Sequence, residues 1–341
     1  MKFDYIIGNP PYQENINDDG GNSSLAKQLF PAFVKDAIES SESYVSFIIP
    51  ARWFTGDAQD KSFLKLRSFI RENNHISHLY YYENAKEVFP NVALKGGVCY
   101  FLYNKHYNGT VNFYTCKSGS EFLSKRNLFI DGIDIILTDN IYPQLIDKIN
   151  TVDFISLTTI TKGRNAFGIV GKQDVIDDIS EKEYFENAYE LRCKADEIRY
   201  VSKDKITKNI DLADKYKVFI SKSAGDPRTD KKVIGNPYVG KLKSVCSDSL
   251  IPIGDFNTEI EAENLSKYLM TKFSRALIQI SKSSQNVYQI VYRFVPLQDF
   301  TENSDIDWSV SIKEIDKQLY RKYNLSDDEI KFIENNVKEM A

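Results

Sequence analysis

Apolar runs and helical stripes alternate along the first hundred residues, which is typical of a layered α/β sheet. An apolar run at residues 5–7 stops at a Gly-Asn-Pro-Pro sequence, so a strand there ends in a rigid turn. After a polar, glycine-rich loop, apolar residues recur at helical spacing over residues 30–38. Residues 44–50 predict a buried strand, and residues 61–72 predict an amphipathic helix. Two strand–helix units therefore open the chain.

Three further runs are rich in β-branched and aromatic residues and have no helical stripe between them: 78–82, 97–103 and 110–114. We expect them to be consecutive strands of the same sheet. With the preceding units, they predict the second half of a doubly wound α/β sheet over residues 1–120. A short strand and a helix within residues 121–153 would link this part to the rest of the chain.

The periodicity is less regular after this linker. Short β-rich runs at 216–221 and 250–253 are mixed with a helical stretch at 259–279. This mixture predicts an α+β module over residues 154–300.

The last part of the chain, residues 301–341, is predicted to be a helical tail. Ser326 and Glu329 form a capping box, and Leu325 can pack on Ile330 as a hydrophobic staple. We therefore expect a helix over residues 327–338.

Composition describes a globular protein of two domains. The chain has 341 residues, of which 42% are hydrophobic and 27% charged. No stretch approaches eighteen apolar residues and no basic leader precedes an apolar run, which predicts a cytoplasmic protein without a membrane segment. The four cysteines are widely spaced and the histidines number three, so we expect reduced, structural thiols and no metal site.

The charge balance changes along the chain. A net charge of -4 is not typical of a nucleic-acid-binding protein. Residues 162–243, however, contain 18 Lys and Arg against 14 Asp and Glu, an excess of four positive charges. This segment could face a polyanion, although a mixed solvated surface accounts for the excess almost as well.

The candidate chemistry lies at the end of the first predicted strand. Asn9, Pro10, Pro11 and Tyr12 follow it, at the edge where open α/β sheets bind their ligands. The Asn9 side-chain oxygen and the Pro10 carbonyl could accept the two hydrogens of an exocyclic amine, and the prolines would hold that carbonyl rigidly. Tyr12 offers a flat face for an extruded base. The alternative is a Pro-Pro turn that only ends a strand.

Asn9, Pro10, Pro11 and Tyr12 resemble the signature of amino-methyltransferases, above all the adenine-specific (N6) DNA methyltransferases of type II restriction-modification systems. The resemblance extends over most of the chain and is weakest between residues 120 and 230. The other similar segments are residues 47–54, 87–90, 95–101, 293–300 and 305–308.

The resemblance implies a Rossmann-like methyltransferase sheet over residues 1–120, followed by a DNA target-recognition domain at 154–300. It implies S-adenosylmethionine as cofactor, double-stranded DNA as partner and an adenine flipped into the site. It also implies that Phe89 stacks on that adenine; the alternative is a core phenylalanine beside a turn proline.

One departure from the family concerns the cofactor. The family places a Gly-rich strand–turn–helix for S-adenosylmethionine before the signature, and here three residues precede Asp4. The glycines of residues 163–171 fit that fingerprint poorly and follow no clear strand. We therefore expect an incomplete cofactor pocket, with the other half supplied by a second chain, absent or lost.

Arg164, Lys231, Lys232 and Lys241 are the candidate DNA contacts, to phosphates that position a duplex without reading its sequence. Ordinary solvated charge explains them equally well. Nearby, Asn236-Pro237-Tyr238 lacks the second proline of the signature, so we interpret it as a turn in the DNA-facing module.

Two alternatives to a complete DNA methyltransferase remain open. The chain could be a catalytically incomplete DNA-binding subunit that needs a partner with the cofactor half. It could also be a glutamine or RNA amino-methyltransferase, although those enzymes usually lack a large domain after the signature. No nuclease constellation is recognisable in the sequence.

Overall fold

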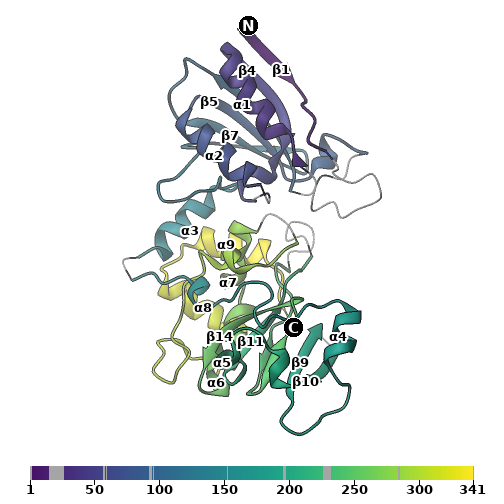
Figure 1. Cartoon of the computed structure of the whole chain (residues 1–341). Helices are drawn as coiled ribbons and strands as arrows, with labels where there is room; N and C mark the ends of the chain where they lie inside the picture. The colour runs from purple at the N-terminus through teal and green to yellow at the C-terminus, as the bar shows by residue number, and fades with distance from the viewer. Residues whose placement is uncertain are drawn as a thin grey trace. The chain divides into compact units, whose positions relative to one another are not determined.

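The computed structural model describes residues 2–14, 27–56, 58, 60–91, 94, 96–151, 153–194, 197–225, 232–282 and 285–340. The chain divides into two compact units, Met1–Pro143 and Gln144–Ala341 (Figure 1). The boundary falls inside a helix, α3 (Ile141–Ile149). No helix of the described residues is long and apolar enough to cross a membrane.

A six-stranded sheet forms the centre of the first unit, in the order β1-β4-β6-β5-β7-β8. The four strands β1, β4, β5 and β7 run in one direction, and β6 and β8 run opposite to them. The carboxyl ends of the four parallel strands therefore share one end of the sheet, which we call its carboxyl end. The strands are β1 (Phe3–Gly8), β4 (Ser41–Pro50), β5 (Ile76–Tyr82), β6 (Val98–Asn104), β7 (Val111–Lys117) and β8 (Ser120–Arg126).

Two helices, α1 (Phe30–Ser40) and α2 (Ser62–Glu72), pack on one face of this sheet (Figure 1). Their apolar stripes meet alternate residues of the strands, as the period of two in a strand requires. The core between them contains side chains that are at most 1% exposed, among them Phe30, Phe63, Val45, Leu79 and Phe101. The predicted strand–helix units and the run of strands after them are confirmed.

The opposite face of the sheet carries a row of tyrosines, which we call the tyrosine face: Tyr5, Tyr44, Tyr80, Tyr100 and Tyr114. Tyr80 stacks on Tyr100 and Tyr114 with ring centroids 4.5 and 4.1 Å apart, and Tyr5 stacks on Tyr44 at 5.3 Å. Most of these rings are half-buried, and Tyr5 is 69% exposed. The face is therefore apolar but open to solvent.

The strand β8 was not predicted, because its side chains are mostly exposed and show no apolar alternation. It pairs with β7 through a tight turn at Ser118 and Gly119, both with positive φ (52° and 77°). Residues 120–126 therefore belong to the sheet of the first unit, whereas the sequence placed residues 121–153 in a linker.

The second unit is an α+β structure. It contains two three-stranded sheets, β10-β9-β13 and β12-β11-β14. The strands are β9 (Tyr189–Lys194), β10 (Glu197–Val201), β11 (Tyr216–Ser221), β12 (Tyr238–Gly240), β13 (Ser244–Cys246) and β14 (Leu250–Phe256). The helices of this unit, after α3, are α4 (Gln173–Ile179), α5 (Ile210–Ala213), α6 (Glu259–Met270), α7 (Lys272–Ser281), α8 (Ile312–Lys322) and α9 (Asp327–Asn336).

Short elements complete the described chain. A two-stranded ribbon joins β2 (Gln13–Glu14) to β3 (Lys27–Gln28). The 3-10 helices are η2 (Ala51–Phe54), η3 (Ala85–Glu87), η4 (Leu157–Thr159), η5 (Lys203–Lys205) and η6 (Gln289–Tyr292).

The helical stretch predicted at 259–279 breaks at Thr271. The Thr271 hydroxyl donates to the carbonyl of Tyr268 (2.6 Å) and accepts the N–H of Ser274 (3.2 Å). One side chain thus ends α6 and caps α7. The apolar stripe continues through the break, which is why periodicity alone did not reveal it.

The C-terminal residues pack into the second unit and do not form a separate tail. The Asp316 carboxylate, on α8, accepts the N–H groups of Lys272 (3.0 Å) and Phe273 (2.9 Å) at the start of α7. The Phe273 ring also stacks on Tyr323 at 5.0 Å. The predicted capping box is confirmed, since Ser326 and Glu329 make both of its hydrogen bonds at the start of α9.

Candidate active site

The four signature residues lie directly after β1, at the carboxyl end of the sheet. Asn9 and Pro11 are exposed, Pro10 is buried and Tyr12 is half-buried. The Tyr12 carbonyl accepts the N–H of Leu29 (3.0 Å), which ties the end of the signature to the start of α1. The rigid Pro-Pro segment therefore presents the Asn9 side chain to solvent from a fixed backbone.

The Tyr12 ring leans against the core of the sheet. Its hydroxyl is shielded from solvent beside the side chains of Asn9 and Cys99, without a hydrogen bond of ordinary geometry among the described residues. Burial, together with the neighbouring Cys99, raises the pKa of Tyr12. Trp53 also reaches the Cys99 thiol, whose pKa burial raises to about 12. Tyr12 is therefore neutral at physiological pH, and the hydroxyl end of its ring is buried.

Two other segments of the family resemblance reach the same end of the sheet. The turn after β4 is tied to the one before β6, because Ala51 donates its N–H to the Gly97 carbonyl (3.0 Å). Gly97 has a φ of +79°, and a Cβ there would lie 2.3 Å from the carbonyl oxygen of Tyr82 at the end of β5. Glycine is therefore required where these segments meet. Lys95, in the same motif, lies outside the described residues.

Phe89 also lies near this end of the sheet. It follows β5 through η3, is half-buried and donates its N–H to the Ala85 carbonyl (2.8 Å). β4 and β6 separate β1 from β5, and three strand spacings amount to about 14 Å. The signature and Phe89 therefore share one end of the sheet, on strands that are not neighbours.

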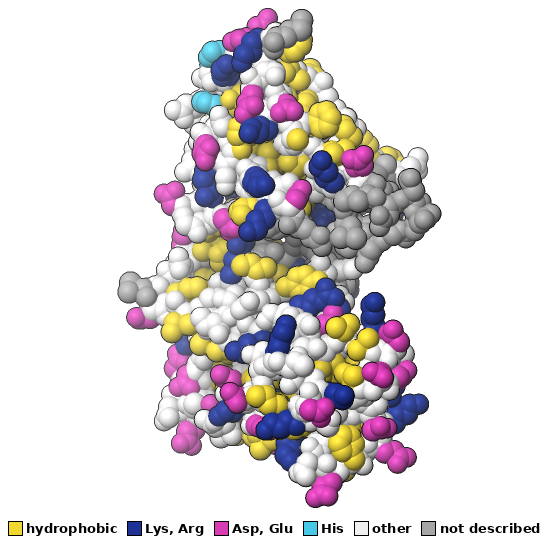
Figure 2. Space-filling view, viewed as in Figure 1, with side chains coloured by type: hydrophobic (Ala, Val, Ile, Leu, Met, Phe, Trp, Pro, Cys, Tyr) yellow, Lys and Arg dark blue, Asp and Glu magenta, His cyan; other side chains and the backbone are white. Residues whose placement is uncertain are grey.

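The candidate DNA contacts lie in the second unit. Arg164 is exposed and bonded to Asp248 (2.5 Å), and Lys241 is paired with Glu259 (3.2 Å). Lys232 is exposed, and Lys231 lies outside the described residues. On the face shown in Figure 2, Lys and Arg side chains of this unit are interspersed with Asp and Glu. Asn236 is exposed just before β12, as expected of a turn.

The glycines of residues 163–171 have packing roles in the second unit. A Cβ at Gly168, which has a φ of +82°, would lie 1.8 Å from the Thr207 hydroxyl, and one at Gly171 would lie 2.9 Å from the Asp248 carboxylate. The segment follows the 3-10 helix η4 and not a strand of a sheet. These features agree with the sequence interpretation that it is not a cofactor loop.

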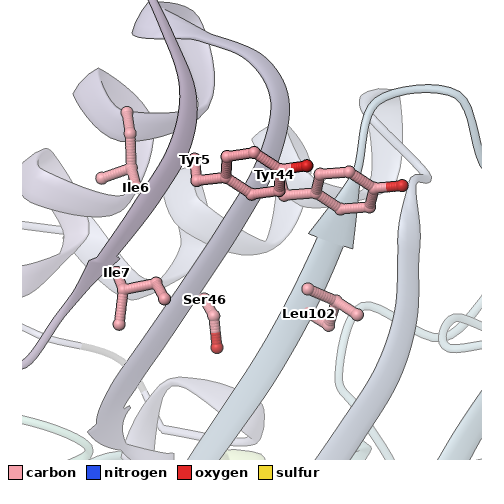
Figure 3. Close-up of a pocket in the computed structure, with 6 residues that line it drawn as sticks. All are labelled: Tyr5, Ile6, Ile7, Tyr44, Ser46 and Leu102. Carbon is pink, nitrogen blue, oxygen red and sulfur yellow. The ribbon is translucent and has the colours of Figure 1, made fainter.

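The outer side of β1 is an exposed sheet edge, as expected of a sheet that lacks its cofactor-binding half. Within the described residues β1 pairs with β4 alone, so its other side offers unpaired backbone groups. Ile7 is 83% exposed there. A shallow pocket opens beside it, lined by Tyr5, Ile6, Ile7, Tyr44, Ser46 and Leu102 (Figure 3). Tyr5 and Ile7, two residues apart in β1, place apolar side chains on the same face of that strand, and this spacing is visible in the sequence.

Two sequence comparisons relate this chain to known proteins. Residues 1–89 match the model of the Eco57I restriction-modification methylase family. Over 161 residues the chain is 36% identical to an uncharacterized adenine-specific methylase of Mycoplasma pneumoniae, covering 45% of this chain and 37% of that protein. The resemblance to adenine-specific methylases of restriction-modification systems is thereby confirmed.

Solved structures of restriction-modification enzymes are similar to nearly the whole chain. The type IIL enzyme MmeI in complex with DNA matches at 10% identity, with a TM-score of 0.48, over 98% of this chain and 52% of MmeI. The type IIG restriction endonuclease BpuSI matches at 14% identity, with a TM-score of 0.38, over 98% of this chain and 53% of BpuSI. The chain thus spans about half the length of these enzymes.

Proposed function

We propose that this chain carries the adenine-binding and DNA-reading parts of a DNA adenine-N6 methyltransferase of a restriction-modification system, acting in the cytoplasm. The main support is the position of Asn9, which is exposed at the carboxyl end of a parallel strand and is followed by a buried proline and, after Pro11, a half-buried tyrosine. The family match over residues 1–89 supports the reaction class.

In this proposal the chain's own residues prepare the amine of a flipped adenine for attack. The Asn9 side-chain oxygen and the Pro10 carbonyl each accept one N6 hydrogen, which draws the lone pair out of conjugation with the ring. The Tyr12 ring stacks on the base, and Phe89 is a second stacking candidate. After transfer, the cationic nitrogen loses a proton to water, so no dedicated base is needed.

S-adenosylmethionine is the methyl donor that the family resemblance implies. The pocket beside β1 is lined by apolar and hydroxyl side chains, with no carboxylate among its described residues for ribose hydroxyls or an ammonium group. These residues do not fit the cofactor by themselves. We propose that a polypeptide outside these 341 residues pairs with β1 and holds the donor.

Substitution of Asn9 tests the proposal. Asn9→Ala should abolish N6-methyladenine formation in a methylation-deficient host that also supplies the donor-holding polypeptide. DNA binding by the purified protein should be unchanged, because Asn9 is exposed and lies in the first compact unit, whereas the proposed DNA-reading part lies in the second. Asn236→Ala, at the near-signature of the second unit, is the matched control and should be silent. Methylation that survives Asn9→Ala would sink the mechanism.

The side of β1 that is unpaired within the described residues favours a DNA-binding subunit that depends on its partner for the donor. In that case the chain alone binds DNA and is inactive until its partner arrives. A host that expresses the wild-type chain alone would then show no methylation, although the purified chain binds duplex DNA. Methylation at one recurring motif would instead identify a complete enzyme.

A further inference from the structure

Arg164 is held by a carboxylate that is almost entirely buried. Its Nε and Nη2 atoms both donate to Oδ2 of Asp248, at 2.9 and 2.5 Å. The side chain of Asp248 is 9% exposed, whereas that of Arg164 is 56% exposed. One edge of the guanidinium is therefore fixed against the protein, and the group extends into solvent.

The Asp248 carboxylate is a fixed anchor. Its Oδ1 accepts the N–H of Gly171 (2.9 Å), and Lys222 approaches Oδ2 at 3.4 Å. Burial alone would raise the pKa of Asp248, but Arg164, Gly171 and Lys222 together hold that pKa below its usual range. The carboxylate is thus ionised at neutral pH, and with two cations on it the cluster has a net charge of about +1.

The backbone that carries Arg164 is also fixed. The next turn is anchored by the Phe167 side chain, which is fully buried, and by Asn209, which donates to the Ala166 carbonyl (2.5 Å). On the other side of Arg164, nothing lies within 4 Å of a Cβ built at Gly163. The backbone is therefore anchored on one side of Arg164 and open to solvent on the other.

The N–H groups of Arg164 that do not contact Asp248 match the hydrogen-bond acceptors of guanine. With the Nε–Nη2 edge bonded to Asp248, the adjacent edge presents parallel N–H groups from Nη1 and Nη2. Guanine offers two acceptors at this spacing, O6 and N7, in the major groove. A guanidinium that is ordered before binding loses little side-chain entropy on contact. Reading a base edge requires a fixed orientation of the donors, whereas a contact to a phosphate requires it less.

We propose that Arg164, oriented by Asp248, reads a guanine in the major groove of the recognised duplex. This inference rests on the proposed function. Asp248 is a positioning residue in this arrangement. Lys222 adds positive charge beside the guanidinium, within reach of the same duplex.

The test begins with selection of duplexes from a randomised pool by the full chain. The wild-type protein should enrich a motif containing a guanine that Arg164→Lys no longer requires, because lysine keeps the charge but loses the two-donor edge. Replacing that guanine with 7-deazaguanine should weaken wild-type binding about tenfold and affect Arg164→Lys by less than about twofold. Lys331→Ala, a loss of an exposed cation on α9 of the same unit, should leave the motif unchanged.

The outcomes separate this inference from the function it rests on. A wild-type chain that enriches no motif and binds DNA without salt dependence would reject the DNA-reading role itself. An enriched motif that Arg164→Lys and Arg164→Ala both retain would overturn the inference alone. A retained motif with a salt slope lower by about one in Arg164→Ala would make Arg164 a phosphate contact and also overturn it. Asp248→Asn, if folded, should lose the same guanine preference.

Discussion

Gly97 is a residue whose replacement the first unit should tolerate poorly. A side chain there meets the Tyr82 carbonyl at 2.3 Å in a backbone with a φ of +79°. We expect Gly97→Ala to lower the free energy of unfolding by at least about 2 kcal/mol, measured by denaturant titration. Gly119→Ala is the control, because Gly119 has a similar φ of +77° but open space around it, and it should cost about 1 kcal/mol. Equal losses would mean that backbone strain alone matters.

Asp316 makes the stability of the second unit depend on pH. Burial raises the pKa of its carboxyl to about 6 in the folded protein, above about 4 in the unfolded chain. Its contribution is therefore full below pH 4 and is lost as pH rises through 6. Relative to Asp316→Asn, the wild-type free energy of unfolding should fall by about 1 kcal/mol between pH 5 and pH 7.

Subtracting the stability of Asp316→Asn from that of the wild type at each pH cancels the contributions of the other titrating groups. Glu329 and Glu334, whose folded-state pKa values are lowered, stay ionised in the folded protein over that range, and in the unfolded chain they titrate alike in both proteins. Parallel stability curves for wild type and Asp316→Asn would contradict the assignment.

At the scale of the element, Thr271 holds the corner between α6 and α7. Thr271→Val keeps the shape of the side chain but leaves the Ser274 N–H and one bond to the Tyr268 carbonyl unmade in a buried place. We expect a loss of about 1–2 kcal/mol in thermal or denaturant unfolding. Thr271→Ser retains the hydroxyl and should lose less. A larger loss in Thr271→Ser would point to the methyl group instead.

The elements that the sequence predicted best are those with a buried face. β4 to β7 and α1 and α2 alternate or repeat because one side of each meets the same core. β8 escaped prediction because both of its faces are largely exposed, and the α6–α7 corner did so because a single hydroxyl makes it. The apolar pattern of the sequence indicates which positions are buried. It does not indicate which hydrogen bonds end a helix or a strand.

The sequence likewise predicted only part of the candidate functional residues and their contacts. The position of Asn9 to Tyr12 at a strand end could be read locally, since a strand, a turn and an aromatic residue adjoin in sequence. The contact of Arg164 with Asp248 joins residues 84 positions apart and has no local signature. Residue types alone identified Arg164 as a candidate, but only the fold supplies its partner.

At the scale of the whole molecule, the outer side of β1 should make the isolated chain associate with itself. Its backbone is unpaired within the described residues, and Ile7 and Tyr5 are mostly exposed. Sedimentation of the wild-type chain should show concentration-dependent association that Ile7→Lys reduces. Ile260→Lys, at another exposed isoleucine (61%), should have no effect. A wild-type chain that remains monomeric at high concentration would contradict this prediction.

The same strand bears on how a cell must make the protein. An unpaired strand edge with an apolar face is prone to aggregation from the moment it leaves the ribosome until another polypeptide pairs with it. If a second polypeptide pairs with β1, the two chains must be synthesised in equal amounts. Any excess of this chain would be bound by chaperones or degraded by proteases. The dose of the proposed methyltransferase would then be set by its scarcer half.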